Sequence, residues 1–255
     1  MNRSSKVKRP YQLALRATQA ESTRERIIAA ASRLFVERGY AATSIDEIAA
    51  AAGVSRATVF TSVGGKPTLL KTALDVAIVG DDAPVALPDR PRSVAIRAER
   101  DPRRYLSLYA ELVTEMGSRL AGIYEAVRGA AGADPDARAL WESHLAQRHQ
   151  GAANVVGDVL GKGRLRAGLD REAAADIIWL LNDAGLYHLL VLRRGWTPGK
   201  YQAWLAETMI RQLVPDETRE VVRELAPKAA GSTRVTRAPG KSRRPRVKIK
   251  KETSS

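Results

Sequence analysis

The sequence predicts an all-α protein. Apolar residues recur along the chain at the spacing of amphipathic helices, and no stretch shows strand-like alternation bounded by hairpin turns. Apolar residues make up 44% of the 255 residues but aromatic residues only 5%, and alanine is abundant. A chain of this length and composition can bury one large helical core or two modest ones.

The composition also narrows the classes of protein and site. With no cysteine, the chain has no disulfide, no thiolate nucleophile and no zinc site built on cysteine. It contains no apolar run of 18 residues, and its first residues lack the apolar segment of a signal peptide. We therefore expect a soluble, cytoplasmic protein.

The formal net charge of +14 is concentrated at the two ends of the chain. Residues 1–20 carry five basic residues and no acidic one, and residues 228–255 carry ten basic residues and one acidic one. These segments contribute +5 and +9, which leaves the 207 residues between them with no net charge. Such tails either attract polyanions by releasing counterions from phosphates or are merely solvated ends, and the residues favour neither reading.

In chain order, the first element is a basic arm over residues 1–20, of which residues 11–20 can extend helically into the next element. Such an arm can enter a minor groove of DNA, and charge is the evidence for it. A packed helix is predicted from Ser22 or Thr23 to Gly39. Its apolar stripe comprises Ile27, Ile28, Ala31, Leu34 and Phe35.

Residues 43–66 hold two short helical patterns separated by a tight turn, which indicates a helix-turn-helix. Ser44 occupies an N-cap position and Glu47 lies three residues on, so the two side chains can form a capping box. The helix that starts there ends at Gly53, a residue type that tolerates the left-handed conformation. Ser55 then caps a second helix.

The second helix, which reaches about Ser62, is too polar on one side for a core element. Val54 and Val59 can face inward. The other side presents one guanidinium and three hydroxyls, from Arg56, Thr58, Thr61 and Ser62. These groups suit a DNA groove, because arginine can bond a guanine edge and hydroxyls can bond bases or phosphates. The alternative is an ordinary solvated polar face.

Residues 23–66 closely resemble the DNA-binding domain of the TetR family of transcriptional regulators. The matching features are, in order, LFVERGY, the TSIDEIAAAAGVS core, the recognition-helix start SRATVF, and a Gly-Lys before the next helix. Phe60 departs from the family pattern, since it lacks the tyrosine hydroxyl that is often directed at a phosphate. A second departure is the sequence Gly64, Gly65, Lys66 and Pro67, which replaces the usual cap.

The resemblance implies an N-terminal three-helix domain with a helix-turn-helix, followed by a helical ligand-binding and dimerisation domain. It divides the chain into a basic flexible arm (1–20), a DNA-binding domain (21–66), a regulatory domain (67–214) and a basic disordered tail (215–255). The residues that it implies for DNA binding are Thr43, Ser44, Ser55, Arg56, Ala57, Thr58, Phe60, Thr61, Ser62 and Lys66.

Helical patterns continue after the helix-turn-helix. A helix from Pro67 to about Val79 stands where the family has its connecting helix, which transmits movement between the two domains. A proline-containing loop over residues 80–102 follows, with one short turn around residues 93–100. Further helices are expected over residues 101–120, 123–127, 134–161, 170–195 and 197–215, with an interhelical loop at residues 161–168.

The last two long helices are apolar on more than one side, which is typical of helices that also pack against a partner. One set of side chains can point into the domain: Trp179, Leu186 and Leu190. Another set is left for the partner: Ile178, Leu181, Leu189 and Leu192. In the family these helices form a four-helix bundle, so the resemblance implies a homodimer. A twofold dimer presents its recognition helices about 34 to 36 Å apart, so the operator should be near-palindromic.

A regulatory cavity is expected among the helices of residues 101–192. The candidates for its lining combine apolar surface with a few polar groups: Tyr105, Tyr109, Met116, Trp141, His144, Trp179 and Asn182. Plain core packing is the alternative for each of them. His144 and His149 are five residues apart, which is not the i, i+4 spacing of two metal ligands on one helix, so no metal site is expected, and no cofactor.

Three classes of function compete. The sequence has no glycine-rich phosphate loop, no HExxH and no GxSxG motif, so an enzyme is not expected. A DNA-coating protein that uses its basic tails without reading sequence is the alternative to a regulator. We expect a homodimeric, nucleoid-associated regulator that binds double-stranded DNA. Members of this family are most often repressors, and we expect a small-molecule effector to release the protein from DNA.

Overall fold

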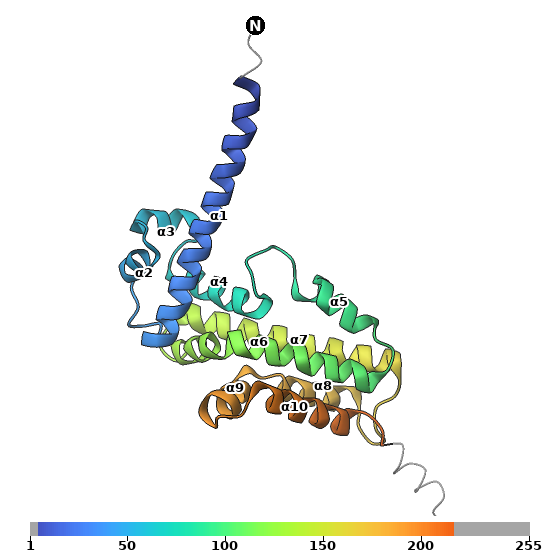
Figure 1. Ribbon diagram of the computed structural model, residues 1–255. Helices are drawn as coiled ribbons and strands as arrows, with labels where there is room; N and C mark the ends of the chain where they lie inside the picture. Colours follow the sequence, from blue (N-terminus) through green and yellow to red (C-terminus); the bar gives the residue numbers. More distant parts are fainter. Residues whose placement is uncertain (1–4, 217–255) are drawn as a thin grey trace, which may run out of the picture. The chain divides into compact units, whose positions relative to one another are not determined.

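Residues 5–216 fold into ten α-helices, one 3-10 turn and one π-helical segment, without a strand (Figure 1). This computed structural model describes those residues, and the side chains of residues 15–216. The helices are α1 (Ser5–Arg38), α2 (Ile45–Ala52), α3 (Arg56–Ser62), α4 (Lys66–Val79), α5 (Pro91–Ala98), α6 (Pro102–Ala130), α7 (Pro135–Lys162), α8 (Arg171–Leu181), α9 (Ala184–Tyr187) and α10 (Pro198–Leu213), with η1 (Leu87–Asp89) and η2 (His188–Arg193) between them. The predicted all-α fold class is confirmed.

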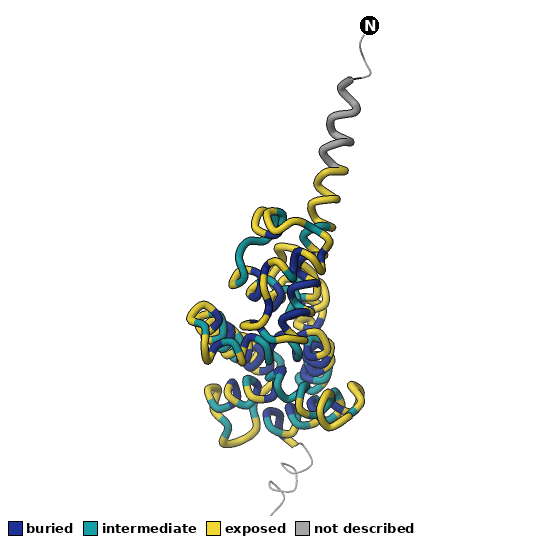
Figure 2. The backbone as a smooth tube through the Cα atoms, turned by 90° about the vertical axis from the view of Figure 1, so that its left-hand side faces the viewer, coloured by how far each residue is buried: buried dark blue, intermediate teal, exposed yellow. Residues whose placement is uncertain are grey.

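The first helix is longer than the sequence analysis expects. The predicted helical extension over residues 11–20 is present, but α1 begins at Ser5 and not at Ser22 or Thr23. Residues 11–38 contain neither glycine nor proline and are rich in good helix formers such as alanine, arginine and leucine. The segment predicted as a flexible arm is therefore helical from Ser5, and its residues 15–22 are exposed (Figure 2).

One apolar cluster joins the first four helices to the end of α6. Phe35 of α1, Ile48 of α2 and Val59 of α3 are fully buried in it. Leu70 of α4 and Val127 of α6 belong to the same cluster and are also fully buried. The predicted helix-turn-helix therefore does not have a core of its own, because α4 and α6 complete it.

A second apolar cluster lies between α6, α7, α8 and α10. Leu106, Val156, Ile178, Leu205 and Met209 are fully buried there. In Figure 1, α6 and α7 run side by side, with α4 on one side of them and α8 and α10 on the other. The helix α6 contributes to both clusters and thus links the two halves of the described chain.

Two predicted helices, over residues 101–120 and 123–127, form a single helix, α6. Its glycines do not interrupt it, because the helix is held by packing on both sides. Gly117 is buried, and a Cβ atom added there would lie 2.7 Å from Cδ2 of Tyr187. The absence of a side chain at this position lets the ring of Tyr187 pack directly on the backbone of α6.

The predicted helix over residues 170–195 is interrupted. It ends at Leu181, and Asp183 starts α9 by accepting a hydrogen bond from the backbone N–H of Gly185 (2.7 Å). The expected turn around residues 93–100 is the eight-residue helix α5. The helices predicted over residues 134–161 and 197–215 are confirmed, and the loop predicted at residues 161–168 begins at residue 163, because α7 continues to Lys162.

The break also changes which side chains face outward. Ile178 and Leu181, which the sequence analysis leaves for a partner, are buried, so that assignment is wrong for these two residues. Leu189 and Leu192 are 56% exposed, as expected, and Leu180 is 63% exposed. Trp179, Leu186 and Leu190 are partly buried and pack against the second cluster.

Replacing Gly117 with alanine should destabilise the fold. The added methyl group meets a buried ring, and such overpacking costs about 1 to 3 kcal/mol, which exceeds the gain of up to about 1 kcal/mol from replacing glycine in a helix. Gly129→Ala is the matched control in the same helix, since nothing lies within 4 Å of a Cβ atom there. Urea unfolding should show lower stability for Gly117→Ala and equal or higher stability for Gly129→Ala. Equal effects of the two would contradict the packing argument.

Candidate nucleic-acid interface and cavity

The start of α2 is fixed by the predicted capping box. The hydroxyl of Ser44 accepts a hydrogen bond from the backbone N–H of Glu47 (3.2 Å), whose carboxylate accepts one from the backbone N–H of Ser44 (2.8 Å). This backbone hydrogen bond is the main reason that the pKa of Glu47 is lowered. Gly53 ends the helix with φ of 67°, the left-handed conformation that the sequence analysis assigns to it.

The recognition helix α3 is anchored at three points. Ser55 caps it by accepting a hydrogen bond from the backbone N–H of Thr58 (3.1 Å). Val59, on the inner side of α3, is fully buried. At its end, the guanidinium of Arg24 in α1 donates to the carbonyl oxygen of Ser62 (2.6 Å). These contacts fix which side of α3 faces away from the protein.

That outer side carries most of the predicted DNA-binding residues. Arg56, Ala57, Phe60 and Thr61 are exposed, and Thr58 and Ser62 are partly exposed. The guanidinium of Arg56 lies 2.7 Å from the carboxylate of Asp46 in α2 and 5.5 Å from the centre of the Phe60 ring. These two contacts define the position of the guanidinium. The side chain of Arg56 is still 57% exposed, so it remains accessible to a ligand.

The other predicted DNA-binding residues differ in their exposure. Ser44 and Ser55 are exposed at the starts of α2 and α3. Lys66 is partly exposed, with its ammonium group 4.2 Å from the centre of the Tyr40 ring. Thr43 is only 2% exposed, and its hydroxyl donates to the carbonyl oxygen of Gly39 (2.8 Å). Thr43 thus supports the turn before α2 and does not reach the surface.

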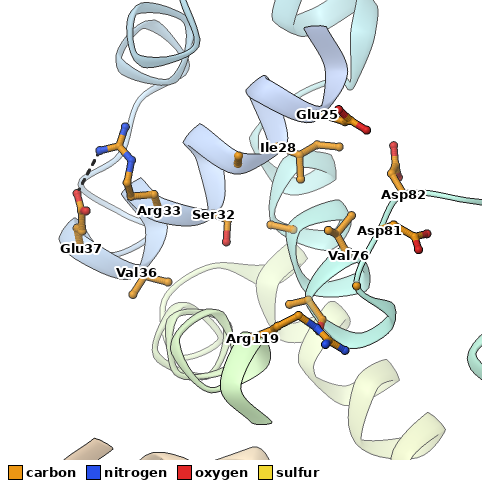
Figure 3. A pocket seen from close by; sticks show the side chains of 14 residues that line it. Glu25, Ile28, Ser32, Arg33, Val36, Glu37, Val76, Asp81, Asp82 and Arg119 are labelled. Carbon is orange, nitrogen blue, oxygen red and sulfur yellow. Dashed lines mark hydrogen bonds and ion pairs between the residues drawn. The ribbon is translucent and has the colours of Figure 1, made fainter. Parts of the chain in front are cut away.

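A cleft of about 610 Å³ lies between α1, α4 and the middle of α6 (Figure 3). Most charged groups around it are already paired within the protein. Arg33 pairs with Glu37 (3.5 Å), and Arg119 donates to the carbonyl oxygen of Ala77 (3.3 Å). Asp82 pairs with Arg24. Arg119 thereby joins α6 to α4, and the pair of Arg24 and Asp82 joins α1 to the segment after α4. We assign no ligand to this cleft.

A second cavity of about 630 Å³ lies within the C-terminal half. Its walls come from the end of α4, residues 83–88, and helices α6, α7, α9 and α10. Four of the seven residues that the sequence predicts for a regulatory cavity line it: Tyr109, Met116, His144 and Asn182. The structure therefore brings these four candidates together from three separate parts of the chain.

The other three candidates lie outside this cavity and are packing residues. The hydroxyl of Tyr105 donates to the carboxylate of Asp158 (2.8 Å). The ring of Trp141 packs edge-on against that of Tyr124, with their centres 4.9 Å apart. Trp179 packs in the same way against His149. For these residues the core-packing alternative describes the structure.

Most of the polar wall of the cavity was not predicted from the sequence. Arg148 donates to the carboxylate of Asp183 (2.8 Å), to the carbonyl oxygen of Trp179 (2.7 Å) and to the side-chain oxygen of Asn182 (3.0 Å). Asn182 in turn donates to the hydroxyl of Tyr109 (3.0 Å). The available signal was Asp183 itself, a carboxylate in the middle of an otherwise apolar stretch.

The described part of the chain shows neither a metal cluster nor a membrane span formed by one helix. No group of three or more histidine, aspartate or glutamate side chains there is arranged to hold a metal ion. No single helix of residues 5–216 is long and apolar enough to cross a membrane; α8 with residues 184–193, bent by 41°, passes only as a pair and only by length and composition.

Comparison with known sequences matches residues 27–73 to the family model of bacterial regulatory proteins of the tetR family. The transcriptional regulator SrpR of Pseudomonas putida is 43% identical over 58 residues, which are 23% of this chain and 27% of SrpR. The regulator TtgR, also of Pseudomonas putida, is 28% identical over 182 residues, which are 68% of this chain and 83% of TtgR. These relatives are described as helix-turn-helix transcriptional regulators and not as enzymes.

Solved structures give the same result. NalD, the secondary repressor of the MexAB-OprM multidrug efflux pump in Pseudomonas aeruginosa, is 26% identical with a TM-score of 0.60, and the match covers 78% of this chain and 99% of NalD. A transcriptional regulator from Saccharomonospora viridis, solved in complex with choline, shares the fold at 22% identity with a TM-score of 0.58, covering 76% of this chain and 98% of that one. The family match over residues 27–73, the helical C-terminal half and these relatives together support a TetR family transcriptional regulator.

Proposed function

We propose that this protein is a ligand-responsive repressor that binds a near-palindromic operator as a homodimer and is released from it by a small molecule. The observation that carries the proposal is the exposed side of α3, where Arg56 and Thr61 point outward above the fully buried Val59. A helix held in this way can enter a major groove without unfolding any part of the domain. The relatives that are transcriptional regulators support the same reading.

The helix α4 provides a direct connection between the cavity and the DNA-binding half. Near its end, Ile78 and Val79 line the cavity. Near its start, Leu69 and Leu70 are buried in the cluster that also holds Val59 of α3. A ligand that favours a different position of α4 would therefore shift the recognition helix, by an amount set by its difference in affinity for the two arrangements.

The dimer is proposed from the exposed apolar side chains of the C-terminal half. Leu180 is 63% exposed, and Leu189 and Leu192 are 56% exposed. Three large exposed leucines on neighbouring segments are typical of an interface between chains. A second copy of the chain is the partner that the family resemblance implies.

The second candidate function is sequence-independent coating of DNA by the basic tails. The charge of the chain ends favours it, since residues 228–255 alone carry a net charge of +9. These residues lie outside the part that the structure describes. This function predicts no preference among duplexes, so one experiment separates the two candidates.

Selection of bound duplexes from a random DNA pool, with the full-length protein, tests the proposed function. We expect enrichment of a near-palindrome whose half-sites lie about one helical turn apart or a multiple of it. Fluorescence anisotropy should then show a preference for this duplex over random DNA on the order of 10³ or more. Failure to enrich any sequence, with an affinity that collapses as salt rises, would favour the coating protein instead.

Arg56→Ala should weaken binding to the selected operator by about 1 to 3 kcal/mol, because it removes the guanidinium that can read a base edge. The change should be smaller on random DNA, so the preference between the two duplexes narrows. Arg104→Ala is the control, since Arg104 is an exposed arginine on α6. Anisotropy titrations measure both. Unchanged operator affinity would remove Arg56 from the base-reading residues.

Deleting residues 228–255 should flatten the salt dependence of DNA binding and leave the preference for the operator intact. The expectation follows from counterion release, in which each phosphate that is neutralised contributes to the slope of log affinity against log salt concentration. Titrations at several salt concentrations measure that slope for both lengths of chain. An unaltered slope would show that the tail does not contact DNA.

A further inference from the structure

Two polar atoms of the cavity wall are buried without a partner. The hydroxyl of Tyr201 and Nε2 of His144 have no hydrogen-bond partner among the described residues. Both residues line the cavity, and their exposed fractions are only 1% and 5%. A buried polar group without a partner costs free energy, so such an atom in a residue that lines a cavity is a candidate for a hydrogen bond to a ligand.

The charged groups of the same wall are, in contrast, already paired. The carboxylate of Asp183 accepts hydrogen bonds from Arg148 (2.8 Å) and from the hydroxyl of Tyr124 (2.7 Å). Asp75, at the edge of the cavity on α4, pairs with Lys71 (2.5 Å). Asp75, Arg148 and Asp183 are the charged residues of the described cavity lining. No charge there is left to compensate a charged ligand.

The protonation states agree with an uncharged site. Burial raises the pKa of Tyr201, so its hydroxyl keeps its proton at neutral pH. Burial lowers the pKa of His144 to about 4, and the nearby Arg148 lowers it as well. At neutral pH the imidazole is therefore uncharged, with one N–H donor and one nitrogen acceptor.

Apolar side chains make up much of the remaining wall. They come from α4, residues 83–88 and α6, and include Ile78, Val85, Leu87, Val113, Met116 and Leu120. A charged ligand would lose its hydration against this surface, whereas an apolar ligand would gain from the contact. The volume of about 630 Å³ lies within the range for sites that take small organic molecules.

We propose that the cavity binds an uncharged, mainly apolar molecule with a hydrogen-bond acceptor, such as a carbonyl oxygen, to which the hydroxyl of Tyr201 donates. The uncharged imidazole of His144 provides a second hydrogen bond. That this molecule also releases DNA rests on the proposed function. Its binding in the cavity does not.

A set of three naphthalenes of similar shape tests the chemical class. The neutral dye N-phenyl-1-naphthylamine, whose fluorescence rises in apolar surroundings, reports occupancy of the cavity in the full-length protein. Its competitors are 2-acetylnaphthalene, which carries a carbonyl acceptor, 2-ethylnaphthalene, which carries no polar group, and 2-naphthoate, which carries a negative charge. We expect the ketone to compete about 2- to 10-fold better than the hydrocarbon, and the carboxylate at least about 10-fold worse than the ketone. The inference would be overturned by no dye binding, by no competition or by preference for the carboxylate.

Tyr201→Phe tests the hydrogen bond itself, with Tyr105→Phe as the matched control outside the cavity. Tyr201→Phe should abolish the advantage of the ketone over the hydrocarbon and leave hydrocarbon binding unchanged. It should also leave the unfolding temperature unchanged or raise it, because the lost hydroxyl has no hydrogen-bond partner among the described residues. Tyr105→Phe should keep the ketone advantage but lower the unfolding temperature, because it removes the bond to Asp158. If Tyr201→Phe keeps the ketone advantage, Tyr201 does not hold the ligand.

The same proteins separate this inference from the proposed function. Operator binding is measured by anisotropy with and without the ketone. If the ketone binds as predicted but leaves operator affinity unchanged, the cavity assignment stands and its role in release from DNA fails. If the ketone changes operator affinity, but the Tyr201→Phe variant still binds the ketone better than the hydrocarbon, the proposed ligand-responsive function stands. The hydrogen bond assigned to Tyr201 is then wrong.

Discussion

The burial of α2 and α3 against α1, α4 and the end of α6 is the constraint on which the rest of the structure depends. Helices of eight and seven residues are too short to be stable alone in water. Ile48 and Val59 have no exposed surface, and the apolar cluster around them reaches Val127 in α6. The orientation of the polar side of α3 is thus set partly by the C-terminal half. A shared core of this kind lets a change in one half reach the other.

Polar contacts add a second connection between the same regions. Arg24 of α1 donates to the carbonyl oxygen of Ser62 at the end of α3 and pairs with Asp82 in the segment after α4. The next residues of that segment, 83–88, form one wall of the cavity. A molecule that moves this wall would therefore act on the end of the recognition helix through Arg24 as well as through α4. Two routes of this kind make the coupling less dependent on any single contact.

Local capping signals were read correctly from the sequence, whereas features set by distant packing were not. The capping box of Ser44 and Glu47 and the left-handed Gly53 depend on neighbours within a few residues, so the pattern contains the answer. The predicted helix over residues 101–120 runs through Gly117, but the need for glycine there appears only when Tyr187, 70 residues away, is placed against it. Likewise, Arg148 reads as a surface arginine of α7 until Asp183 is brought to it. Long-range partners of this kind are absent from a single sequence.

The helix predicted over residues 170–195 is interrupted at the cavity. A regular helix would hide the backbone groups of Asn182 and Asp183 in its hydrogen bonds and spread their side chains around its axis. The break at Asn182 and Asp183 turns both side chains toward Arg148, and with Tyr109 they form the polar wall. The helical pattern was correct as local propensity and was overridden at one point by the partly buried carboxylate of Asp183 and its partner Arg148. Departures from local rules gather at functional sites, and here the departure pairs the charges that would otherwise select a charged ligand.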